Sequence, residues 1–190
     1  MYRTFFALTS QKVQIGSNGD FMAAARIPEK DYSFAIRELL RITGSVRCID
    51  VAPRLHFFAG TWECIRAMCQ SDHGLKGLFS ADDDRLSYYL DSTQSKLLKA
   101  YGLYYDQAMN LFFFSTDIRL ERIQSIAKER TNMEYCLLGN ERKSNGLHVF
   151  THENRLANEE ICQKIIDLCV FAQERSIPFA FPLQRLDLVL

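Results

Sequence analysis

The residues of this chain that can carry nucleophilic chemistry are its cysteines and histidines. The sequence holds six cysteines and four histidines. Cys64 is expected near the start of a helix, where the positive end of the helix dipole favours a thiolate. His56 or His148 could take up its proton, because a cysteine paired with a histidine suffices for thiol catalysis. A small cysteine-dependent hydrolase or transferase is therefore one hypothesis. The alternative is that Cys64 is packed as a small apolar residue.

The spacing of these cysteines and histidines does not match that of metal ligands. On a helix, Cys64 and Cys69 point about 140° apart, so they do not share an ion with His73. A structural zinc site also needs four ligands. The acidic run 82–84 follows Ser80 and fits the first turn of a helix, where the dipole favours carboxylates. We therefore expect no metal and no cofactor.

The sequence lacks the usual motifs of nucleotide sites and matches an RNA-binding pattern only in part. Neither G-x-G-x-x-G nor G-x-x-x-x-G-K-[ST] occurs in the sequence, so no glycine-rich phosphate loop is predicted. RNA-recognition modules stack bases on aromatic residues of their first and third strands, which here would be 111–114 and 143–150. The second segment matches the module's pattern only at Lys143, Gly146 and Phe150. RNA binding is thus a third hypothesis, without claimed membership of that family.

The charge and composition narrow the class of protein further. The chain has 23 basic and 23 acidic residues, 47% hydrophobic residues and 24% charged residues. A balanced charge gives no overall field that would steer the chain to nucleic acid or to an anionic membrane. No run approaches the 18 apolar residues of a membrane span. The cysteines are too sparse for a secreted disulfide scaffold. We expect a cytoplasmic protein with reduced thiols.

The periodicity of apolar residues predicts both helices and strands, and hence an α+β fold. Helices are expected over 31–42, 61–70, 93–107, 116–129 and 158–174, with a further helix opening at Ser80. Strands are expected over 2–8, 46–51, 109–114, 134–138, 147–151 and 186–190. The sheet should be mixed or antiparallel, with helices packed on it.

From residue 109 onward the expected order is strand, helix, strand, strand, helix, strand. That is the βαββαβ order of a ferredoxin-like unit. It allows a helix-rich N-terminal lobe over 1–108 and a second lobe over 109–190. No linker rich in proline, glycine or serine separates the two halves, so we expect a single compact domain over 1–190.

Aromatic residues are the remaining distinctive feature, at 12% of the chain. Tyr104 and Tyr105 would diverge by about 100° on the expected helix, so one of them should be exposed. Phe179 and Phe181 form a second apolar stretch near the C-terminus. Exposed aromatic residues are typical of the cores of protein interfaces. The first hypothesis is therefore a non-catalytic adaptor or accessory subunit that binds another protein, for instance in bacterial or viral secretion or virulence machinery.

Overall fold

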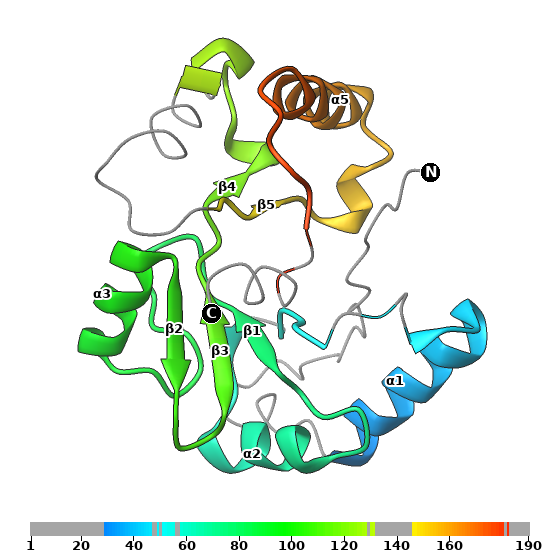
Figure 1. Cartoon of the computed structure of the whole chain (residues 1–190), viewed down its shortest axis with the longest axis vertical. Coiled ribbons are helices and arrows are strands. Elements are labelled where there is room, and N and C mark those ends of the chain that lie inside the picture. Colours follow the sequence, from blue (N-terminus) through cyan, green and yellow to red (C-terminus); the bar gives the residue numbers. More distant parts are fainter. Residues whose placement is uncertain are drawn as a thin grey trace, which may run out of the picture.

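The chain is an α+β protein, shown as a computed structural model in Figure 1. The structure describes residues 29–46, 49, 51–55, 58–128, 130–131, 146–180 and 182. Its helices are α1 (Glu29–Thr43), α2 (Trp62–Gln70), α3 (Ser92–Tyr101) and α5 (Glu159–Glu174), with the 3-10 turns η3 (Leu120–Arg122) and η4 (Glu153–Arg155). Its strands are β1 (Gly77–Phe79), β2 (Leu103–Asp106), β3 (Leu111–Phe114), β4 (Ile118–Arg119) and β5 (Val149–Phe150).

A three-stranded sheet is formed by β1, β3 and β2 in that order. The central strand β3 runs parallel to β1 and antiparallel to β2. Its four apolar residues alternate between the two faces, since successive side chains of a strand point to opposite sides. The β2–β3 turn is held by the Asp106 carboxylate, which accepts hydrogen bonds from the backbone N–H groups of Ala108 and Met109. The β2–β3 hairpin includes residue 108, the position at which the sequence allowed a boundary between an N-terminal and a C-terminal lobe.

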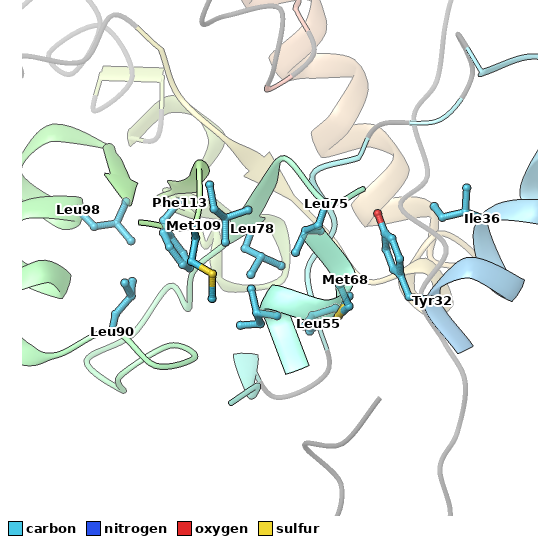
Figure 2. Close-up of a cluster of buried hydrophobic side chains, with 12 residues drawn as sticks. Tyr32, Ile36, Leu55, Met68, Leu75, Leu78, Leu90, Leu98, Met109 and Phe113 are labelled. Atoms are coloured by element: carbon cyan, nitrogen blue, oxygen red, sulfur yellow. The ribbon is translucent and has the colours of Figure 1, made fainter. Parts of the chain in front are cut away.

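The main core lies on one face of this sheet, beneath α2. Figure 2 shows side chains from α1, α2, the sheet and the intervening loops converging there. Phe113 is fully buried and packs near the rings of Tyr88, Tyr89 and Tyr104, with centroids 5.7 to 6.2 Å away. The buried members of the cluster are Tyr32, Ile36, Leu55, Ile65, Met68, Leu75, Leu78, Leu90, Leu98, Met109, Leu111 and Phe113.

A second apolar cluster forms where α5 packs on η3 and the parallel pair β4–β5. Figure 1 shows these elements beyond one end of the three-stranded sheet. The helix α5 begins at the cap residue Asn158, whose side chain accepts from the Glu160 N–H. The cluster is built from Ile118, Leu120, Ile123, Ile161, Leu168 and Phe171. Among the described residues a third, smaller cluster lies on the other face of the sheet, where Ala52 and Phe114 are buried against Phe79, Leu103 and Phe112.

Three helix predictions are confirmed with small shifts in their bounds. The helix predicted over 31–42 is α1, the one over 61–70 is α2, and the one over 158–174 is α5. Thr61 caps α2 as expected, because its hydroxyl accepts from the Cys64 N–H at 3.3 Å. In these segments the apolar period and the cap residue point to the same structure.

The helix predicted over 93–107 is wrong in its second half. The observed α3 ends at Tyr101, because Gly102 adopts a left-handed backbone with φ of 71°. The Gly102 N–H closes the helix on the Leu98 carbonyl, and the following residues enter β2. Glycine reaches this conformation at little steric cost, so it ends helices readily. Tyr104 and Tyr105 therefore lie on a strand.

Two further helix predictions are wrong. Residues 82–85 are bends, so no helix follows Ser80, and Asp82 is used in ion pairs instead. The segment predicted as one helix over 116–129 starts as β4 and η3, since Ile118 and Arg119 pair with β5. The ferredoxin-like order is not confirmed, because β3 pairs with β1 and β2 while β5 pairs with β4. The strands predicted over 2–8, 134–138 and 186–190 lie outside the described residues.

Candidate functional site

The exposed end of the sheet carries the candidate site. Tyr105 on β2 and Phe112 on β3 are directly paired in register, so their side chains share one face. Their ring centroids lie 4.6 Å apart at an interplanar angle of 32°. The Tyr105 hydroxyl donates to the Asn110 side-chain oxygen at 2.9 Å, and 44% of Tyr105 is exposed. We call Tyr105 and Phe112 the aromatic pair.

The other end of the same face is covered. His148 lies edge-on against the rings of Phe79 and Phe114, with centroids 5.0 and 5.5 Å away. Phe114 is fully buried, whereas at the β2 side Tyr105 is exposed and Phe112 is half-buried. Gly77 allows this packing, because a Cβ atom there would meet the Phe114 ring at 2.5 Å. This face of the sheet is therefore buried at β1 and partly exposed to solvent at β2.

Tyr104 points the opposite way from Tyr105. Its ring faces Phe113 in the main core, and its hydroxyl accepts a hydrogen bond from the Gln94 side-chain amide at 3.0 Å. Tyr104 is half-buried. Neighbouring residues of a strand point to opposite faces, so the strand divides the two tyrosines into one core residue and one surface residue.

The second predicted interface segment is partly described. Phe179 follows α5 and is 72% exposed, the largest value among the exposed apolar residues of the described chain. Phe181 lies outside the described residues. On α5 itself, Ile166 and Val170 are also exposed, at 53% and 42%. They are four residues apart and hence share one side of the helix.

Cys64 lies in the first turn of α2, as the sequence predicts, and its side chain is half-buried. It packs against the main core together with Cys69. Burial raises the pKa of the Cys69 thiol to about 11; the positive charge of Lys76 lowers this pKa slightly, and the negative charge of Asp106 raises it slightly. His56 lies outside the described residues. The packing of Cys64 suits a core residue, and the thiol hypothesis stays a prediction.

His148 is held by the segment that joins the two apolar clusters. Its backbone N–H donates to the Asp117 carboxylate at 2.8 Å, and its ring Nδ1 lies 3.7 Å from the same oxygen. Ser115 donates its hydroxyl to the other Asp117 oxygen at 2.8 Å. In a serine triad the hydroxyl contacts the imidazole, not the carboxylate. The Asp117 carboxylate therefore connects the start of β4 to the residue before β5, and these three side chains do not form a catalytic triad.

Sequence reasoning missed Phe112 as the partner of Tyr105. The signal was present: Asp106 and Asn110 bracket a short polar turn between two apolar aromatic runs, which is typical of a hairpin. The helical periodicity assigned to residues 93–107 concealed it.

Comparisons of the chain with family models, with curated proteins and with solved structures give no match. Among the described helices, none is both long enough and apolar enough to cross a membrane.

Proposed function

We propose that the chain is a non-catalytic protein-binding protein, an adaptor or accessory subunit of a larger complex that acts in the cytoplasm. The observation that carries the proposal is the aromatic pair. Tyr105 is fixed by a ring contact and by its hydrogen bond to Asn110 before any partner arrives. A partner that covers it loses little side-chain entropy on binding, which is a property of interface hot spots.

The contacts of α3 limit the surface to one side of β2. The helix packs on the Tyr104 side of the strand, because its Leu98 joins the main core and its Gln94 amide donates to the Tyr104 hydroxyl. The exposed side chains of Leu97 and Tyr101 on α3 are therefore not assigned to the surface that carries Tyr105. Exposed aromatic side chains are typical of protein interfaces. We place the docking surface on the Tyr105 face of β2, with Phe179 as a separate candidate contact.

The proposal is tested by capturing partners of the tagged protein from extracts of its own source. The extract is kept at physiological salt with nuclease added, and bound proteins are identified and quantified by mass spectrometry. We expect a stoichiometric partner that is lost with Tyr105→Ser. The control is Ile42→Ser, which removes a 69% exposed apolar residue from α1. A partner that binds Tyr105→Ser as strongly as the wild type would contradict this surface, as would the absence of any stoichiometric partner.

A further inference from the structure

The two edge strands of the three-stranded sheet, β1 and β2, differ in how their outer backbone groups are bonded (Figure 1). On the outer side of β1, the N–H groups of Gly77 and Phe79 donate to the carbonyls of Val51 and Pro53 at 3.3 and 3.2 Å. The Phe79 carbonyl accepts a hydrogen bond from the Tyr88 hydroxyl at 2.7 Å. The edge of β1 is therefore closed to another strand, since its backbone groups already have partners.

The hydrogen-bond pattern shows which backbone groups of β2 point away from the sheet. In an antiparallel pair, alternate residues bond the neighbouring strand, and the residues between them point outward. The Ser115 N–H donates to the Gly102 carbonyl at 3.1 Å, so Gly102 belongs to the set that bonds the β3 side. The Phe112 N–H donates at 3.0 Å to the residue before β1, and therefore does not bond its register partner Tyr105. Both observations direct the backbone groups of Leu103 and Tyr105 outward.

The outer edge of β2 is open. Among the described residues, no hydrogen bond satisfies the outward N–H and C=O groups of Leu103 and Tyr105. The helix α3 packs on the Tyr104 face of the strand and donates no hydrogen bond to these groups. A row of unpaired donors and acceptors at the edge of a sheet is a template for pairing with another chain. The strand can therefore accept a further strand beside it.

The side chains next to this edge favour an apolar segment as its occupant. Leu103 and Tyr105 are two residues apart on β2, so their side chains lie on one face. Each already has an aromatic neighbour on β3, because Leu103 is in register with Phe114 and Tyr105 with Phe112. An added strand would place two of its own side chains, also two residues apart, beside Leu103 and Tyr105. Apolar or aromatic residues at these two positions would continue both rows.

We propose that β2 binds an extended segment of a partner protein by strand addition, and that this segment carries apolar or aromatic residues at positions i and i+2. In such complexes the main-chain hydrogen bonds give affinity and the alternate side chains give specificity. A partner segment fits better than a second copy of the chain. A stable interface between two proteins buries about 1,200 Å² or more, and pairing of a four-residue strand supplies much less. This inference rests on the proposed protein-binding function and names the class of partner.

The first test is amide hydrogen exchange of the full chain, measured by nuclear magnetic resonance. In the free protein the N–H groups of Leu103 and Tyr105 should exchange faster than those of Tyr104 and Asp106, which bond β3. If all four exchanged equally slowly, the edge of β2 would already be covered and the proposal would be overturned.

The probe for strand addition is the synthetic peptide acetyl-Lys-Thr-Val-Thr-Tyr-Thr-Lys-amide, whose valine and tyrosine stand at i and i+2. At saturation it should slow exchange at Leu103 and Tyr105 at least about tenfold and leave Tyr104 and Asp106 little changed. The control peptide, acetyl-Lys-Thr-Thr-Val-Tyr-Thr-Lys-amide, has the same composition, but its valine and tyrosine are adjacent and point to opposite faces. We expect the control peptide to bind more weakly.

Methylation of the peptide nitrogens separates strand addition from side-chain contact without any change to the protein. In a bound strand, one alternate set of N–H groups faces β2 and the other faces solvent. One methylated peptide carries the methyl groups on valine and tyrosine, and the other carries them on the first two threonines. We expect one of the two to lose at least about tenfold in affinity and the other to bind nearly as the parent peptide does. Equal effects of the two methylated peptides would contradict strand addition.

Two variants test the same point from the side of the protein. Tyr105→Ser removes the ring and keeps the outward N–H, whereas Tyr105→Pro removes both. Proline is tolerated on an edge strand where its nitrogen faces solvent. We expect Tyr105→Pro to bind the peptide more weakly than Tyr105→Ser, and equal affinities would count against a backbone role. Circular dichroism establishes that both variants are folded. If Tyr105→Pro is not, the methylated peptides decide.

The outcomes separate this inference from the protein-binding function on which it rests. No binding of the peptide at millimolar concentration would overturn strand addition. Binding that leaves the N–H groups of Leu103 and Tyr105 unprotected would also overturn it, while the Tyr105 surface would stand. Protection that grows with protein concentration in the absence of peptide would identify a second copy of the chain instead of a partner. Failure of the protein-binding function itself is seen in the capture experiment, as the absence of a stoichiometric partner.

Discussion

At the scale of single residues, the structure assigns different tasks to side chains of the same type. Tyr104 packs against Phe113 in the core and Tyr105 is exposed at the surface, although the two residues are adjacent in the chain. Asp82 is buried between two arginines, whereas the neighbouring Asp84 is fully exposed and paired with Lys99. The residue type alone does not distinguish such pairs, because burial is set by the strands and loops that carry them.

Glu121 is a carboxylate whose charge contributes to stability. One of its oxygens accepts from the backbone N–H of His152 and from the Thr151 hydroxyl, and it also contacts the His152 ring. Burial alone would raise the pKa of Glu121, but these hydrogen bonds outweigh it and lower the pKa to about 2. The stabilising effect is therefore complete above the unfolded pKa and is lost as the pH falls toward 2.

We expect Glu121→Gln to lower the free energy of unfolding by about 1–2 kcal/mol at pH 7, because hydrogen bonds to a charged group are stronger than those to a neutral amide. The difference from the wild type should shrink as the pH falls below about 4.5, the ordinary pKa of glutamate. Urea denaturation between pH 7 and pH 3 measures it, with the exposed Glu38→Gln as control. A difference that stays constant with pH would mean that the charge has no role.

The thiols give a second test at this scale. Cys69 has a pKa raised by burial to about 11, whereas Cys169 is exposed on α5. Only the thiolate reacts, so Cys169 should be alkylated faster than Cys69 at pH 7. Mass spectrometry of peptides after brief labelling of the native protein reports both sites. If Cys64 instead reacted far ahead of the other described thiols near pH 6, the packing account would be wrong and the thiol hypothesis favoured.

At the scale of elements, short-range signals decide where helices begin and end. The helix α3 begins with Asp91 and Gln94, whose side chains and backbones bond each other reciprocally, and ends at Gly102. Because Gly102 has a φ of 71°, any residue with a Cβ atom is strained there. This strain affects both the end of α3 and the start of β2.

Gly102→Ala should lower the free energy of unfolding by about 1–2 kcal/mol, the cost of a left-handed conformation for alanine. The matched control is Gly44→Ala after α1, where φ is 67° and no atom lies within 4 Å of the added Cβ. Chemical denaturation compares the two. An equal cost at both positions would show that the strain is local, whereas a larger loss at Gly102 would show that it spreads into β2. No loss at Gly102 would contradict the assigned cap.

The sequence predicted elements well where the period, the cap and the contacts agree locally. The helices α2 and α5 are examples, because Thr61 and Asn158 cap regular apolar stripes. Prediction failed where a distant partner decides the structure. Ile118 and Arg119 are helix-compatible residues, yet they pair with β5, about thirty residues later in the chain. For the same reason the neighbours of Tyr105 could not be predicted once β2 was taken as helix.

At the scale of the whole molecule, aromatic contacts and ion pairs between described residues join the sheet to the α5 side. Besides the edge-on contacts of His148 with Phe79 and Phe114, the described contacts include the ion pairs of Asp82 with Arg119 and Arg122. These residues come from three segments that are distant in sequence, 79–82, 114–122 and 148. A fourth segment reaches the same place, because the Arg54 guanidinium lies over the rings of Phe58 and Phe150, and Phe58 has a left-handed backbone with φ of 55°.

Asp82→Ala should lower the free energy of unfolding by about 3 kcal/mol, since it leaves Arg119 partly buried without its carboxylate. The nearby Asp84→Ala is the control and should cost less than about 1 kcal/mol, because Asp84 is exposed. Equilibrium denaturation of the two variants measures both values. Equal effects would show that the junction does not depend on the buried ion pairs.

The central claim, that Tyr105 lies in a protein-binding surface, is tested most directly by site-specific photo-crosslinking in living cells of the source. A photoreactive phenylalanine replaces Tyr105 in one protein and Ile42 in another, so that both retain an apolar side chain at an exposed position. Our account predicts that the probe at residue 105 links to one discrete partner and the probe at residue 42 does not. No discrete product from residue 105, or the same products from both positions, would contradict it.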